Sequence, residues 1–308
     1  TAALHAALVA MGTDRECEVI TQAVTFVATA NAIVYCGARP VFLDVDKDTM
    51  GLSPEALLTF LEKQTIRENG ITVNKITKKQ IRACLPVHIF GHPCRIDAIV
   101  EICKSYHIEV IEDCAESLGS IYKKTHTGLF GKCGTLSFNG NKIITAGGGG
   151  AIITNDQKFA EKLKHLTTTA RVSQGQHFVH DKVGYNYRMP NLNAALVCAQ
   201  MENLDRFIES KRKLAKTYES FFKNSDLEFV VEPASAISNY WLNAVKTADI
   251  KMRDQLIDEL NAAGILARPL WRLLNKLDMY AGCQADSLEN SRWLEDRIVN
   301  IPSSAVMT

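Results

Sequence analysis

The alternation of short apolar runs with amphipathic helical segments is the feature that most limits the fold of this chain. Strand-like runs lie at residues 17–21, 39–45, 84–90, 108–113, 134–138 and 151–155. Helical segments at 53–64, 97–106 and 156–166 fall between them, and the first opens with Ser53 and Pro54, a typical helix start. Strands that alternate with helices pair in parallel and are covered on both faces. The sequence therefore predicts an α/β fold whose mostly parallel sheet has helices on both faces.

A change in element order indicates a second domain. Residues 191–222 contain no Pro or Gly and keep a helical apolar spacing, which predicts one long helix. The order beyond it is strand, strand, helix, strand, as in a small α+β domain. We expect a large domain at 1–206 and a smaller C-terminal one at 207–308. We also expect that the natural protein extends beyond both ends of this sequence, at the N-terminal end because the chain opens at Thr1 without Met.

The charge balance and the cysteines restrict partners and location. Lys plus Arg (35) nearly equal Asp plus Glu (34), so the sequence gives no electrostatic reason to expect nucleic acid or an anionic membrane as partner. The nine cysteines form no CxxC pair, which is typical of free thiols in a reducing compartment. No apolar run is long enough to span a bilayer. We therefore expect a cytoplasmic protein.

Chemically useful side chains follow two of the predicted strands. Asp113 ends the run 108–113, Ser137 stands at the end of the run 134–138, and Lys142 follows in a short polar loop flanked by small residues. Ligands of open α/β sheets bind where the carboxyl ends of the strands meet the loops. A buried carboxylate there needs a cationic partner, and a lysine in such a loop is a candidate covalent nucleophile.

Two further positions suit an anionic, aromatic ligand. Thr1 and Ala2 stand at a predicted helix N-terminus, where free N–H groups and the helix dipole favour phosphate. Phe26 follows the first strand and could cover a flat ring. Taken singly, a loop lysine is usually a solvated charge and an Asp at a strand end a turn former. Together they are the parts of a pyridoxal phosphate site: lysine, carboxylate, phosphate donors and an aromatic face.

Six ordered motifs strengthen this interpretation. They are TAALHAAL, VTFVATANAIVYCGARPVFLDVD, LPVHIFGHPC, VIEDCAESLGS, GLFGKCGTLSFNGNKIITAGGGGAIITND and GYNYRMPNLNAAL. With them, nearly the whole chain resembles the sugar aminotransferases of the DegT/DnrJ/EryC1/StrS family, which are fold-type I enzymes dependent on pyridoxal phosphate. The resemblance implies a homodimer whose active site lies at the subunit interface.

The resemblance also assigns roles to individual residues. Lys142 is the implied covalent attachment point of the cofactor, and Asp113 the implied partner of its pyridine nitrogen. The other implied cofactor-binding residues are Thr1, Ala2 and Ser137 at the phosphate, Phe26 over the ring, His88 nearby, and Asn186 from the second subunit. Where many relatives have Gln or His, this chain has Glu116, which we still expect to line the site.

The resemblance further implies a reaction. The motifs are most similar to the subgroup that transfers an amino group, from glutamate in most of the family, to C4 of UDP-linked 4-keto-6-deoxy-N-acetylhexosamines for bacterial surface glycans. The chemistry predicts ping-pong kinetics, with Lys142 as tether and base. Alternatives are a C3-keto or dTDP-linked sugar and a sugar dehydratase of the same fold. An NAD-dependent oxidoreductase is disfavoured, because the glycines 147–150 lead into a strand and not into a helix.

A last group of residues could bind the substrate or a metal. Candidates to meet the sugar or diphosphate are Tyr185, Tyr187, Arg188 and Arg268. His88, His92 and Cys94 suggest a zinc site, but their spacing is loose and no fourth ligand is near, so we expect no metal.

Overall fold

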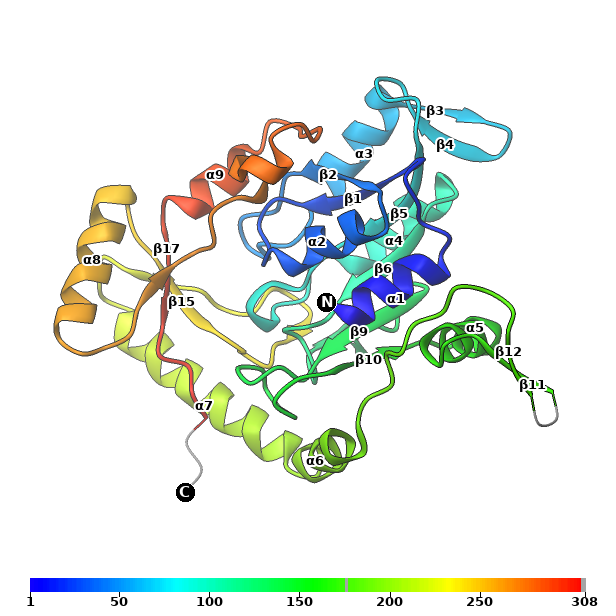
Figure 1. Cartoon of the computed structure of the whole chain (residues 1–308). Helices are drawn as coiled ribbons and strands as arrows, with labels where there is room; N and C mark the ends of the chain where they lie inside the picture. Colours follow the sequence, from blue (N-terminus) through cyan, green and yellow to red (C-terminus); the bar gives the residue numbers. More distant parts are fainter. Residues whose placement is uncertain (175–176, 306–308) are drawn as a thin grey trace.

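The computed structural model describes residues 1–174 and 177–305 and is built around an eight-stranded sheet (Figure 1). Its main path has the order β10-β9-β6-β5-β1-β2, with the hairpin β3-β4 attached at β5. The neighbours from β2 to β9 pair in parallel, whereas β10 is antiparallel to β9. The strands are β1 (Cys17–Gln22), β2 (Arg39–Leu43), β3 (Thr65–Glu68), β4 (Ile71–Asn74), β5 (Gln80–Leu85), β6 (Glu109–Asp113), β9 (Cys133–Ser137) and β10 (Gly150–Ile153). The predicted fold class is confirmed.

Helices cover both faces of this sheet because neighbouring strand residues point to opposite sides. Val19 packs into a cluster with α1 (Ala2–Ala10), α2 (Ala28–Tyr35) and α5 (Gln157–Thr167). The next residue, Ile20, packs with α3 (Pro54–Gln64) and α4 (Ile96–Ser105). Each such buried aliphatic side chain stabilises the fold by about 1.5 to 3 kcal/mol. The two apolar layers fix the sheet whose carboxyl edge carries the site.

The C-terminal part contains a smaller antiparallel sheet of the order β13-β15-β17-β16. Its strands are β13 (Glu228–Phe229), β15 (Asn243–Lys246), β16 (Arg268–Pro269) and β17 (Ile298–Ile301). Helix α8 (Ile250–Ala262) contacts β16 and β17, and α9 (Glu289–Glu295) precedes β17. Minor elements are β7 (Ile121–Tyr122), β8 (Thr125–His126), β11 (Arg171–Gln174), β12 (His177–His180), β14 (Ala236–Ile237) and the short 3-10 helices η1 (Ile89–Gly91), η2 (Leu274–Lys276) and η3 (Asp278–Tyr280).

The connection between the two sheets differs from the single long helix predicted for 191–222. The chain forms α6 (Asn191–Met201) and α7 (Leu204–Phe222), separated by Glu202 and Asn203. Asn203 has a non-helical φ of −108° and ψ of 4° at the start of α7, a position that suits Asn because its side chain competes for backbone hydrogen bonds. Helix α7 runs through the predicted boundary at 206/207, so the domain division stays a prediction.

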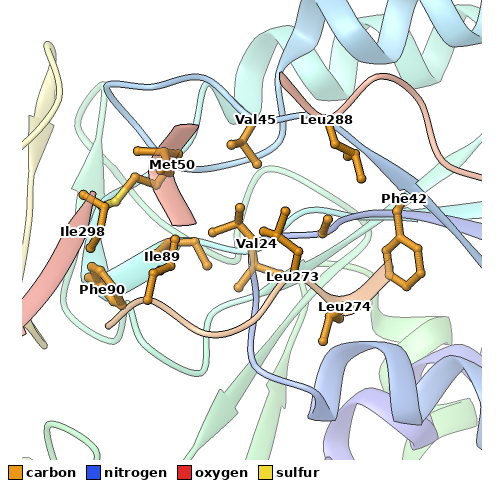
Figure 2. Packing of buried hydrophobic residues seen from close by; sticks show 14 of the residues in the cluster. Val24, Phe42, Val45, Met50, Ile89, Phe90, Leu273, Leu274, Leu288 and Ile298 are labelled. Atoms are coloured by element: carbon orange, nitrogen blue, oxygen red, sulfur yellow. The ribbon is translucent and has the colours of Figure 1, made fainter. Parts of the chain in front are cut away.

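One apolar cluster joins the two parts (Figure 2). Val24, which follows β1, and Phe42 on β2 pack with Leu273, Leu274 and Ile298 from the C-terminal part. The backbone N–H of Leu274 also donates to the Ala23 carbonyl at 3.1 Å. These contacts hold the segment around β16 against the carboxyl edge of the large sheet, where the site lies.

The strand predicted at 84–90 is wrong beyond Leu85. Pro86 has no N–H to donate and ends the regular strand, and beyond it Val87 forms an isolated parallel bridge to Asp113. Phe90 then adopts φ of +57°, a left-handed conformation that is rare for a bulky residue. No helix in the described ranges is both long and apolar enough to cross a membrane.

Candidate active site

A cavity of about 420 Å³ opens at the carboxyl ends of β1, β6 and β9, the edge of the sheet where the sequence predicts a ligand. Eight predicted site residues line it: Thr1, Ala2, Phe26, Asp113, Glu116, Ser137, Lys142 and Arg268. A more open cavity of about 600 Å³ near α3 contains none of the predicted residues. The structure therefore brings together most of the expected site.

Asp113 supplies a buried carboxylate at the end of β6. Its side chain is 3% exposed. The Thr29 hydroxyl donates to Oδ2 at 2.9 Å, and the Ala115 backbone N–H donates to Oδ1 at 3.1 Å. The hydroxyl oxygens of Thr25 and Thr29 lie 2.9 Å apart, and through Thr29 the helix α2 holds the carboxylate in its orientation. Such a fixed carboxylate suits a protonated ring nitrogen.

Lys142 lies in the loop between β9 and β10 and is enclosed by two other side chains. Its side chain is 13% exposed. Nζ lies 3.7 Å from Glu116 Oε1 and 3.7 Å from the centre of the Trp241 ring, a cation–π contact. The indole N–H of Trp241 donates to the Asn141 carbonyl at 2.7 Å, which fixes the ring beside the amine.

Glu116 is a buried acid with an altered proton affinity. The Phe90 backbone N–H donates to its Oε2 at 2.8 Å. Burial raises the pKa of Glu116 from 4.5 to about 7, although Lys142 and the Phe90 N–H oppose this rise. The sequence prediction that Glu116 lines the site agrees with its place in the cavity wall.

Hydrogen-bond donors for an anionic group lie at the N-terminal end of α1. Thr1 is the N-cap of this helix and its side chain makes no capping hydrogen bond, so the first-turn N–H groups stay available. Residues 1–4 line the cavity together with Ser137. A helix N-terminus beside a hydroxyl group is a suitable phosphate site.

Aromatic rings and one cation form the outer wall. Phe26 is exposed, and its ring centre lies 6.4 Å from that of Trp271. Trp271 also contacts Phe90 at 5.4 Å between ring centres. Arg268, on β16, lines the same wall. Flat rings beside a cation can bind a planar cofactor and a charged substrate.

Two lining residues of functional weight, Thr29 and Trp241, were not among the predicted candidates. Thr29 lies three positions after Phe26, at the start of α2, and its spacing from that candidate is a usable signal. Trp241 comes from the C-terminal part, for which the sequence predicted only the order of strands and helix, and no local pattern connects it with Lys142. Its position depends on the packing of the C-terminal part against the large sheet.

His88 lies outside this cavity, in a buried hydrogen-bonded cluster behind it. Its Nε2 lies 3.1 Å from Glu112 Oε2, and its Nδ1 accepts the Cys94 backbone N–H. Within residues 1–174 and 177–305, the one group of metal-ligand type side chains is His88, Glu112 and Cys114, without the His92 and Cys94 considered above. Glu112 already accepts the backbone N–H groups of 128, 130 and 131, so its oxygens serve the fold.

The remaining predicted residues lie away from the cavity of their own chain. Asn186 and Arg188 are exposed, Tyr185 stacks on Tyr187 with ring centres 5.0 Å apart, and the Tyr187 hydroxyl hydrogen bonds His5 at 3.1 Å. They belong to the segment that leads into α6. None of the four is among the described residues that line this cavity.

The cavity residues fit pyridoxal phosphate. Lys142 offers the amine, Asp113 the fixed carboxylate, and the α1 N-terminus with Ser137 the phosphate donors. The glycines at 147–150 lead into β10, which is antiparallel to β9, and do not open a helix. The fold and these residues define a fold-type I enzyme that depends on pyridoxal phosphate.

Comparison with known proteins identifies the family. The chain belongs to the DegT/DnrJ/EryC1/StrS aminotransferase family, which matches residues 1–308. The chain is 38% identical to EpsN of Bacillus subtilis (strain 168), assigned as a pyridoxal phosphate-dependent aminotransferase, over 91% of this chain and 70% of EpsN. It is 37% identical to the GDP-perosamine synthase of Escherichia coli O157:H7, over 98% and 78%. The crystal structure of a family member from Brucella abortus superposes with a TM-score of 0.89 at 26% identity, over 99% and 79%. The protein is a pyridoxal phosphate-dependent nucleotide-sugar aminotransferase.

Proposed function

We propose that this enzyme transfers the amino group of an amino acid, glutamate by preference, to the C4 ketone of a 4-keto-6-deoxyhexose linked to a nucleoside diphosphate. The observation that carries the proposal is the meeting of Lys142 and Asp113 in one cavity, at the carboxyl edge of the sheet, in a chain that matches the family over its whole length. The product would be an amino sugar for a bacterial surface glycan, made in the cytoplasm.

Each residue of the cavity has a separate role in the proposed reaction. Lys142 would hold the cofactor covalently and, once released, move a proton between the substrate carbon and the cofactor. Asp113 would keep the ring nitrogen protonated, while Ser137 and the N-terminus of α1 would bind the phosphate. Phe26 would cover the ring. The bound cofactor supplies an electron sink for the carbon that bears the amino group.

Two nucleotide-linked sugars are candidate substrates, one linked to UDP and one linked to GDP. Sequence motifs of the chain resemble enzymes of UDP-linked 4-keto-6-deoxy-N-acetylhexosamines, as stated above. Relatives named GDP-perosamine synthase, at 37% identity in Escherichia coli O157:H7 and 34% in Caulobacter vibrioides, favour a GDP-linked sugar. Perosamine is itself a 4-amino-4,6-dideoxyhexose, so both kinds share C4 amination. We therefore propose this shared chemistry and let the nucleotide be decided by experiment.

We further propose a homodimer that completes the site. Helix α6 has an apolar sequence but no buried residue, and Leu192 is 86% and Val183 83% exposed. A surface of this kind is typical of an interface with another subunit. Asn186 and its neighbours Tyr185, Tyr187 and Arg188 lie beside it and would reach the cofactor phosphate or the substrate of the second copy.

A substrate panel tests the proposed reaction. The purified protein is incubated with pyridoxal phosphate, glutamate and each of the UDP-, GDP- and dTDP-linked 4-keto-6-deoxy sugars, with C3-keto isomers as controls. Mass spectrometry should find a 4-amino sugar from at least one C4 ketone, and initial rates should follow ping-pong kinetics. Amination of C3 ketones alone, or elimination of water without amine transfer, would contradict the proposal.

A further inference from the structure

The Lys142 amine faces a carboxylate on one side and an aromatic ring on the other. Glu116 Oε1 and the Trp241 ring centre both lie 3.7 Å from Nζ. Little of the lysine side chain is exposed, so water has restricted access to the amine. An amine in such a position must exchange its proton with a nearby group or with the few waters that reach it. Glu116 is the nearest acidic group.

The structure holds the Glu116 carboxyl in a defined orientation. Oε2 accepts the Phe90 N–H, which the left-handed backbone of Phe90 (φ +57°) directs toward it. The Glu116 carbonyl accepts the Asn239 side-chain N–H at 2.8 Å, which anchors the same residue from the C-terminal part. These bonds leave Oε1 directed at Lys142, and a small side-chain rotation would close the 3.7 Å separation to a hydrogen bond.

We propose that Glu116 is a positioning residue that takes the ammonium proton of Lys142 and returns it, so that the amine can react without releasing a proton to bulk water. In this step an N–H bond of the Lys142 ammonium breaks and an O–H bond of the Glu116 carboxyl forms. The pair carries no net charge before or after the transfer. The inference rests on the proposed role of Lys142 as the cofactor-binding lysine.

The electrostatic surroundings support this exchange. Burial raises the pKa of Glu116 to about 7, so this carboxylate binds a proton more tightly than an exposed glutamate does, and accepting the proton costs less free energy. The charged groups that face the pair are Asp113, which also raises the Glu116 pKa, and Arg268 in the cavity wall.

Glu112 is also a buried acid, but its pKa is shifted in the opposite direction to that of Glu116. Burial opposes its ionisation, but hydrogen bonds from His88 and backbone N–H groups lower its pKa below the ordinary value. Both of its oxygens are occupied by donors. Burial of a carboxyl group alone is therefore not sufficient to raise its pKa as it does at Glu116. The difference is the Glu116 oxygen that faces Lys142.

Labelling of Lys142 in the full-length, cofactor-free protein tests the proposal. Reductive methylation is run for short times across a range of pH, and the Lys142 peptide is quantified by mass spectrometry. In the wild type, labelling should rise first near the ionisation of Glu116, reach a plateau, and rise again at higher pH. The E116Q variant keeps an acceptor for the Phe90 N–H and should lose the plateau: its labelling should rise once and continuously, and should exceed that of the wild type several-fold at the pH of the plateau, because no carboxylate holds the amine as an ammonium. The exposed Lys158 is an internal control that should rise once in both proteins.

A single rise in the wild type, or the same two rises in E116Q, would overturn the proposal. If E116Q does not fold, the E116D variant replaces it, because the shorter side chain withdraws the carboxyl from Lys142 and should shrink or displace the first rise. An unchanged profile in E116D would equally overturn it. Since the labelled protein contains no cofactor, failure of the proposed aminotransferase reaction would leave these profiles unaffected.

Discussion

Replacing Glu116 by Gln should make the stability of the protein less dependent on pH. The folded protein binds the Glu116 proton with a pKa of about 7, whereas the ordinary value is 4.5. Because the folded state binds this proton more tightly, the stabilisation is complete below the ordinary value and is lost as pH rises through about 7. At about 1.4 kcal/mol per pKa unit, the wild type should lose about 2 to 3 kcal/mol between about pH 5 and pH 8 relative to E116Q.

Urea unfolding of the two cofactor-free proteins, at one protein concentration and several pH values, measures this difference. The E116Q variant should be close to the wild type in acid and more stable than it at about pH 8. Glu101→Gln is the matched control, since it neutralises an exposed carboxylate on α4, and its difference from the wild type should stay nearly constant with pH.

A difference between E116Q and the wild type that does not change with pH would refute this reasoning. It would mean that Lys142 compensates the buried charge fully, so that Glu116 ionises as an ordinary glutamate does. A wild type that gains stability over E116Q toward alkaline pH would also contradict it, because the ion pair would then stabilise the fold.

Three other predictions concern the site and its support. Asp113→Asn should lower kcat by on the order of 100-fold with a melting temperature near that of the wild type, measured by steady-state kinetics and thermal unfolding. Leu192→Asp should convert a dimer to monomer in light scattering and lower activity, whereas an unchanged mass would argue against the proposed interface. Gly91→Ala should destabilise the fold by more than about 2 kcal/mol, because Gly91 has φ of +94° and a Cβ there would overlap the Asn239 side chain. Urea unfolding checks this last value.

Local sequence patterns were sufficient for the six strands on the main path of the large sheet and for the residues near their ends, but they missed the hairpin β3-β4. Asp113, Ser137 and Lys142 were predictable because parallel strands place their carboxyl ends at one edge, whatever the loops do. Strand 84–90 was predicted too far along the chain: β5 begins at Gln80 and ends at Leu85, whereas the apolar residues continue past Pro86 into a buried turn. Apolar character alone does not distinguish a strand from a buried loop.

Local sequence patterns could not predict contacts between segments that are distant in the sequence. Trp241 reaches Lys142 only because the cluster of Val24, Leu273 and Ile298 holds the two parts of the chain together. The predicted helix 191–222 divides because the two halves have different surroundings: α7 buries Lys211 and Ala215, but α6 buries nothing within the described chain. The family resemblance, and not spacing, supplied Asn186 and the second subunit.

The attachment of the cofactor to Lys142 is the central claim, and reduction with borohydride tests it most directly. Protein incubated with pyridoxal phosphate is reduced, digested and analysed by peptide mass spectrometry, with the K142A variant as control. We predict one modified peptide, containing Lys142, and none in K142A. Cofactor fixed to another lysine, or equal modification of K142A, would contradict the assignment of this cavity as the active site.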